Sequence, residues 1–180
     1  MPIPPHTPAE AISQQTFTAL MWALSYPGRP YDLPAELAPF HAVADALLDI
    51  ETTYFTPDSD LEATLRATGA RARRPSEAAY HFYPTLSGPD LAHIEVASIG
   101  TLLYPDSAAT LIIGCTFGGD QVLQLSGPGI LSTVTLAVSG VPKRLWALRG
   151  AARYPLGWDM FLIDGRRVIG LPRSTVIREG

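Results

Sequence analysis

The 180-residue sequence has a single cysteine, Cys115, and a single lysine, Lys143. One cysteine excludes a disulfide within the chain and a structural zinc site built from several thiolates. Cys115 follows the aliphatic residues 111–114, so we interpret it as a small core residue of a strand and not as a nucleophile. Pyridoxal phosphate needs a lysine for its Schiff base, and Lys143 stands at the expected start of an exposed helix, which is a poor position for that role.

The local signatures of common enzyme classes are also missing. The sequence has no phosphate-binding loop with Gly-Lys-Ser or Gly-Lys-Thr, no Gly-x-Gly-x-x-Gly fingerprint and no Gly-x-Ser-x-Gly elbow. Its four histidines are scattered, without an HExxH motif, so we expect no metal site. We therefore predict no catalytic residue, no metal and no cofactor, and leave open whether the chain is an enzyme.

Charge and hydropathy argue against two classes of partner. The formal net charge is −4 and charged residues make up 17% of the sequence, which gives no general attraction to nucleic acid or to an anionic membrane. No apolar stretch reaches the roughly 20 residues that cross a bilayer. The first residues lack a basic region followed by an apolar run, so we expect no secretory signal and a cytoplasmic protein.

Apolar residues make up 47% of the sequence, which is enough to fill one core. We predict a single domain over residues 1–180, with a flexible lead over residues 1–8. Helical spacing dominates the first third, whereas aliphatic runs separated by Gly-rich turns predict strands in the second half, as listed here: 109–115, 121–125, 131–138, and a hairpin of 159–163 with 168–171 across Asp164-Gly165. The turns between the first three runs are assigned to Gly118-Gly119-Asp120 and Gly127-Pro128-Gly129. Hairpins with intervening helices predict an α/β fold with a mixed sheet covered by helices.

The first helix has clear boundaries in the sequence. Residues 7–10 form a capping box with proline at the first helical position, and Pro27-Gly28 ends the helix. An apolar stripe of four residues is expected to face the core: Phe17, Leu20, Met21 and Leu24. Trp22 lies off that stripe.

Three turn-rich segments combine rigid backbone with polar side chains: residues 25–29, 154–159 and 171–175. Arg29 and Arg173 suit phosphate oxygens, Ser174 and Thr175 add hydroxyl donors, and Asp159 is placed to orient an arginine. The backbone turns expected to support these side chains are Pro27, Gly28, Gly127, Gly129 and Gly157. The competing interpretation is that these segments are only turns, a helix end and a strand end.

These segments also resemble a known family, the H subunit of the carbon–phosphorus lyase core complex. Six stretches match it in family order, from residue 17 to residue 175: 17–29 (FTALMWALSYPGR), 47–52 (LLDIET), 109–111 (ATL), 125–130 (LSGPGI), 154–159 (YPLGWD) and 171–175 (LPRST). Tyr154 stands where the family has phenylalanine and Ser174 where it has threonine, and residues 53–99 show little similarity.

The resemblance implies a three-layer α/β/α fold similar to that of transferases that depend on pyridoxal phosphate (PLP), without the cofactor. It also implies a homodimer that joins the G, I and J subunits. That complex replaces the adenine of ATP with a phosphonate to give ribose 1-alkylphosphonate 5-triphosphate. We expect an accessory subunit without activity of its own, whose candidate partner contacts are Trp22, Tyr154 and Trp158. The alternative is a subunit that binds ATP or a phosphonate itself.

Overall fold

The computed structural model describes residues 7–180. Most of the lead expected over residues 1–8 lies outside the described residues, while Thr7 and Pro8 already belong to the capped start of the first helix. The helices are α1 (Pro8–Ser25), α2 (Pro39–Leu47), α3 (Ser59–Ala67), α4 (Leu91–Glu95), the 3-10 turn η1 (Pro105–Ser107) and α5 (Arg144–Ala151). The strands are β1 (Tyr31–Asp32), β2 (Thr53–Phe55), β3 (Arg71–Ala72), β4 (Tyr80–Tyr83), β5 (Thr110–Gly114), β6 (Thr116–Ser126), β7 (Val134–Ser139), β8 (Asp159–Asp164), β9 (Arg167–Leu171) and β10 (Val176–Glu179).

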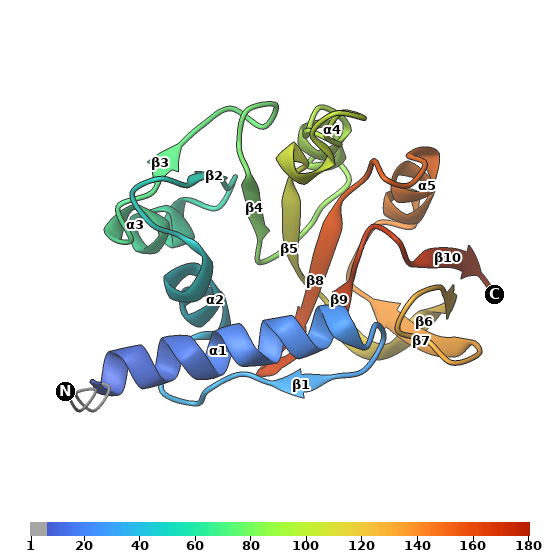
Figure 1. The fold of residues 1–180 in the computed structure, drawn as a ribbon, viewed down its shortest axis with the longest axis horizontal. Coiled ribbons are helices and arrows are strands. Elements are labelled where there is room, and N and C mark those ends of the chain that lie inside the picture. The colour runs from blue at the N-terminus through green and yellow to red at the C-terminus, as the bar shows by residue number, and fades with distance from the viewer. Residues whose placement is uncertain (1–6) are drawn as a thin grey trace.

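The strands form a large sheet and a small one (Figure 1). The large sheet has seven strands in the order β1-β9-β8-β5-β4-β2-β3. Strands β3, β2, β4, β5 and β8 run parallel to one another, whereas β9 is antiparallel to β8 and β1 is antiparallel to β9. The small sheet, β10-β6-β7, is antiparallel. The prediction of an α/β fold with a mixed sheet is therefore confirmed.

Alternate residues of the central strands enter two separate apolar clusters. Ile112 and Phe161 pack with residues of α1, α2 and α3. Leu111 and Leu162 pack with residues of α4, α5 and the small sheet. Successive side chains of a strand point to opposite sides of a sheet, so the two clusters lie on opposite faces. We call them the α1 face and the α5 face.

Helix α1 has the predicted boundaries but not the predicted orientation. The Thr7 hydroxyl accepts a hydrogen bond from the backbone N–H of Glu10, and the Glu10 carboxylate accepts one from the N–H of Thr7, which completes the capping box. The buried residues are Thr16, Ala19, Leu20 and Ala23. Phe17 and Met21 are 54% and 45% exposed, so their assignment to a core-facing stripe was wrong.

The reason is a close approach of two backbones, because α1 crosses β9 and runs beside α2 (Figure 1). A β-carbon added at Gly170 of β9 would lie 2.5 Å from the carbonyl carbon of Ala23. Contact at this distance requires small side chains between helix and strand, so Ala19 and Ala23 face the sheet. The bulky Phe17 and Met21 lie beside the contact between α1 and β9, not inside it.

Other elements differ from the sequence expectations as well. Gly118-Gly119-Asp120 is no turn between strands, because β6 starts at Thr116 and carries a bulge between Phe117 and Gln121 in its pairing with β7. Glycine and a polar residue fit a bulge as well as a turn, which explains the error. Helix α4 has only five residues and ends at Glu95. No helix of the described residues is long and apolar enough to cross a membrane.

Candidate functional site

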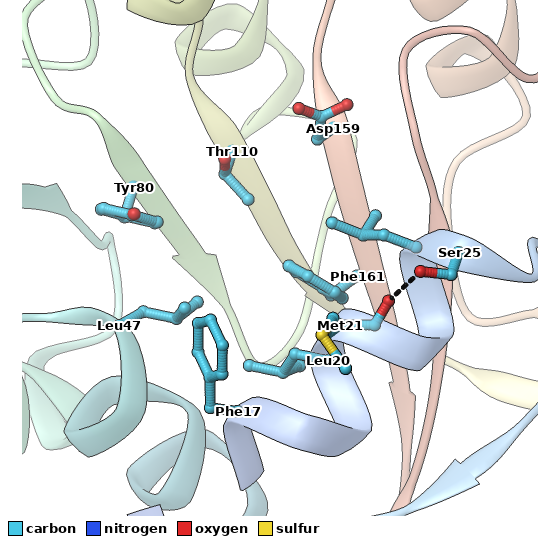
Figure 2. A pocket seen from close by; sticks show the side chains of 10 residues that line it. Phe17, Leu20, Met21, Ser25, Leu47, Tyr80, Thr110, Asp159 and Phe161 are labelled. Atoms are coloured by element: carbon cyan, nitrogen blue, oxygen red, sulfur yellow. Dashed lines mark hydrogen bonds between the residues drawn. The ribbon is translucent and has the colours of Figure 1, made fainter. Parts of the chain in front are cut away.

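A pocket of about 410 Å³ opens between α1 and the amino-terminal ends of central strands of the large sheet (Figure 2). We call it the α1 pocket. Its walls come from α1, α2 and three neighbouring strands, through these residues: Phe17, Leu20, Met21, Leu24, Ser25, Leu47, Tyr80, Thr110, Asp159 and Phe161. The volume lies within the range of about 300–1,000 Å³ that is usual for small-molecule sites. The exposure of Phe17 and Met21 thus belongs to the mouth of this pocket.

Three polar residues form a row across the starts of the strands that line the pocket. Tyr80, Thr110 and Asp159 are the first residues of β4, β5 and β8, and the strand register places Tyr80 beside Thr110 and Thr110 beside Asp159. Figure 2 shows the three side chains at these strand starts, across the pocket from the apolar residues of α1. The pocket therefore lies at the amino ends of the parallel strands, whereas open α/β sheets usually bind ligands at the carboxyl ends.

The hydroxyl of Tyr80 is a neutral donor in this row. Burial raises the pKa of Tyr80, and the negative charge of Asp49 raises it further. The phenol therefore keeps its proton at neutral pH. Ser25 donates its hydroxyl hydrogen to the carbonyl of Met21, which leaves its oxygen available as an acceptor (Figure 2).

Asp159 and Arg173 form an ion pair at the end of this row. The Asp159 carboxylate accepts hydrogen bonds from Nη2 of Arg173 at 2.6 Å and from its backbone N–H at 2.7 Å. The Arg173 guanidinium also donates to the carbonyl of Pro105. The side chains of Arg173 and Asp159 are mostly buried, with 16% and 22% of their surface exposed, respectively. Asp159 therefore holds Arg173 in place, and the pair neutralises both charges; its part in a ligand site stays a prediction.

The loop that carries Arg173 is held by a second arginine that the sequence analysis missed. Arg149 of α5 is buried, and its guanidinium donates to the carbonyls of Leu171, Pro172 and Thr175 at distances of 2.6–3.1 Å. Burial lowers the pKa of Arg149 to about 10, and the charge of Asp159 opposes this shift, so the side chain stays cationic at neutral pH. One signal existed: Arg149 lies at helical spacing from the buried Leu145 and Trp146.

The turn segments predicted from sequence do meet in space. A β-carbon at Gly127 would lie 2.9 Å from the carbonyl oxygen of Ser174, and one at Gly129 would lie 2.9 Å from Cδ of Pro27. Both glycines have positive φ. Gly157, also at positive φ, lies next to the Cβ of Arg173, while the N–H of Gly28 donates to the carbonyl of Gly170. These glycines bring the three segments to one side of the molecule.

Within the described part of the chain, no hydrogen bond or ion pair links Arg29 to Asp159 or Arg173. The guanidinium of Arg29 lies over the ring of Tyr26, 5.4 Å from the centroid. Tyr26 in turn stacks on Trp22 with centroids 5.6 Å apart. Trp22 is partly exposed, so it remains a candidate partner contact.

The four remaining candidates differ in burial. Trp158 is only 4% exposed and belongs to the core of the α5 face, so it is not available to a partner. It directly precedes β8, and the alternation of side chains along the strand points it toward the α5 face. Thr175 is buried, which removes its hydroxyl from a surface ligand site. Tyr154 is exposed, and Ser174 is half-buried. That Arg173 and Ser174 contact a ligand stays a prediction.

The metal-ligating side chains, Cys115 and Lys143 do not form a reactive centre among the described residues. Within residues 7–180, no group of three or more His, Cys, Asp or Glu side chains could hold a metal ion. Burial raises the pKa of Cys115 to about 12, with a further contribution from Asp164, so the thiol is not activated. Lys143 is exposed where α5 begins, as expected.

Comparison with known proteins gives two matches. The family model described as "Bacterial phosphonate metabolism protein (PhnH)" matches residues 7–178. A curated protein of Stutzerimonas stutzeri, named "Putative C-P lyase subunit protein HtxG", is 34% identical over 175 residues, which cover 93% of this chain and 87% of that protein. The resemblance noted in the sequence is thereby confirmed, and the chain belongs to the PhnH family of bacterial phosphonate metabolism proteins.

Proposed function

We propose that the chain is a subunit of a carbon–phosphorus lyase core complex. In this role it supports the formation of ribose 1-alkylphosphonate 5-triphosphate from ATP and a phosphonate, in the cytoplasm, together with G-, I- and J-type subunits. The observation that carries the proposal is the family match over nearly the whole chain. The relative named as a C–P lyase subunit supports it.

The subunit's own contribution is that of an accessory scaffold without separate activity. A surface of exposed apolar residues supports this role: Val96, Ile99, Leu102, Leu103, Tyr104 and Tyr154. They belong to two adjacent loops, because the N–H of Gly157 donates to the carbonyl of Ile99. Large exposed apolar patches mark protein–protein interfaces. We call this surface the loop patch.

The proposal extends to architecture. Helices on both faces of the sheet support a three-layer α/β/α arrangement similar to PLP-dependent transferases, and we expect a homodimer, as the resemblance to the H subunit implies. Lys143 is exposed at the start of α5 and does not line the α1 pocket. This position is consistent with a transferase-like fold that binds no PLP.

Co-purification tests this role. We expect the tagged protein to elute from size exclusion in a stoichiometric complex with G-, I- and J-type subunits. Leu103→Glu and Tyr154→Glu should remove it from that complex, whereas Leu131→Glu should not, because Leu131 is fully exposed outside the loop patch. Elution only as a free dimer, with all three partners present, would reject the proposal.

A second role, contribution of a phosphate- or nucleotide-binding site to the transferase step, is favoured by one observation. The three turn segments converge around Arg173 and Ser174 at the edge of the α1 pocket. If this role holds, ATP or a phosphonate should raise the melting temperature of the isolated subunit, and Arg173→Ala should abolish the rise. An unchanged melting temperature with both ligands would exclude it.

A further inference from the structure

The charge distribution of the α1 pocket restricts what it can bind. Among the described residues that line it, none is cationic, and Asp159 is an acid. The nearest guanidinium, that of Arg173, already binds both oxygens of Asp159 and the carbonyl of Pro105. A phosphate or phosphonate group inside the pocket would therefore meet a carboxylate without a free cation to balance it.

The chemistry of the walls favours an aromatic group. Phe17 and Phe161 contribute rings, and Met21 contributes a thioether, which makes favourable contacts with aromatic rings. On the opposite wall, the hydroxyls of Tyr80 and Thr110 can donate or accept hydrogen bonds at the strand starts (Figure 2). Apolar walls with a few polar groups on one side match a heterocycle whose polar atoms lie along its rim.

We propose that the α1 pocket binds a neutral heteroaromatic base of the purine type and keeps anionic groups outside. This inference deepens the proposed function, because a purine nucleotide is the substrate in that role. The base enters between Phe17 and the sheet, with its polar edge toward Tyr80, Thr110 and Asp159. Any phosphates that it carries point out of the mouth of the pocket, away from Asp159.

Isothermal titration of the full chain with adenosine, adenine, ATP and methylphosphonate tests the proposal. Adenosine and adenine should bind saturably, ATP more weakly than adenosine, and methylphosphonate not measurably. If ATP bound as tightly as adenosine, or if neither adenosine nor adenine bound at millimolar concentration, the proposal would be overturned.

Matched variants locate the site. Phe17→Ala should raise the Kd for adenosine about tenfold or more, which is the usual effect of removing an aromatic stacking partner. Thr110→Val, which keeps the shape of the side chain, should raise it about fivefold through one lost hydrogen bond. Trp22→Ala is the control, because Trp22 is an exposed aromatic residue of the same helix, 42% exposed against 54% for Phe17, and does not line the pocket. Equal Kd values for Phe17→Ala and the wild type would place the adenosine elsewhere and reject the pocket.

This experiment and the co-purification fail independently. A subunit that joins the complex but does not bind adenosine would refute the pocket and leave the proposed function intact. Adenosine binding that depends on Phe17, without any complex, would leave the pocket intact and refute the complex role.

Discussion

The two faces of the large sheet are covered to different degrees. On the α5 face, two helices and the small sheet bury an apolar cluster that includes Trp146 and Trp158. On the α1 face, the long helix approaches the sheet closely only near Ala23 and leaves a pocket beside it, with Phe17 and Met21 at its mouth. The difference indicates that the α5 face mainly stabilises the fold, whereas the α1 face combines a buried cluster of its own with the open α1 pocket.

The strongest test of the stabilising role is Arg149→Met on the α5 face. The carbonyls of Leu171, Pro172 and Thr175 would lose their hydrogen bonds from the guanidinium. The Pro172 carbonyl keeps a bond from the N–H of Thr175, whereas a buried acceptor left without any partner costs about 1–3 kcal/mol. We expect the free energy of unfolding to fall by about 4 kcal/mol or more, measured by urea denaturation. The control, Arg144→Met, removes an exposed arginine of the same helix and should cost less than about 1 kcal/mol. Equal losses for the two variants would break the comparison.

A direct comparison of the faces uses Leu145→Ala and Phe17→Ala. Leu145 is fully buried on the α5 face, so its truncation should cost about 3 kcal/mol. Phe17 is half exposed at the pocket mouth, so its truncation should change the unfolding free energy by less than about 1 kcal/mol. Both values come from the same denaturation experiment. Similar losses would mean that Phe17 is a core residue and that the α1 face is closed in solution.

The α5 face should also have a weak point at low pH, at His81. Its ring is buried, with Nδ1 3.1 Å from the hydroxyl of Tyr83. Its pKa is lowered from 6.5 to about 4, mainly by burial and to a smaller extent by the neighbouring His93, while the backbone of Ala78 and Pro75 opposes the shift. Below pH 6.5 the unfolded chain binds a proton at His81 that the folded chain does not, so stability falls as the pH drops toward 4. We expect a loss of about 2–3 kcal/mol between pH 7 and pH 4.

Denaturation of the wild type and of His81→Gln over this pH range measures that contribution. The variant should show a flatter pH profile, because its side chain does not titrate. Parallel profiles would show that groups other than His81 determine the acid sensitivity.

The smallest effect is expected from the ion pair between α4 and α5. Nη2 of Arg144 lies 2.5 Å from the Glu95 carboxylate, but both side chains are exposed. Glu95→Gln should therefore cost less than about 1 kcal/mol, and 1 M salt should remove the difference from the wild type. A larger, salt-resistant cost would show that the α5 face depends on its surface charges as well as on its core.

Sequence reasoning succeeded where the signal is local. The capping box of Thr7 and Glu10 and the hairpin between β8 and β9 need only neighbouring residues. The capping box is found where predicted, and the hairpin turn lies one residue later than predicted, at Gly165-Arg166. The family resemblance identified the turn segments that converge around Arg173. It did not place Arg29, whose guanidinium contacts Tyr26.

The errors concern features set by packing between distant segments. The exposure of Phe17 depends on Gly170, which is more than 150 residues away in the sequence, so helical periodicity alone assigned it to the core. Arg149 gives no motif, because its partners are backbone carbonyls that any residue could supply. The α1 pocket was not predicted either, since its polar row consists of single residues from three separate strands.

Gly170 has a consequence for selectivity. Because it lets α1 approach the sheet, the absence of one methyl group on β9 determines how far the wall formed by Phe17 and Met21 stands from Tyr80 and Thr110. A homologue with alanine at this position would hold the helix farther away and have a wider pocket, even with every lining residue unchanged. The range of molecules that the family accepts at this site would then be determined by a residue that none of those molecules touches.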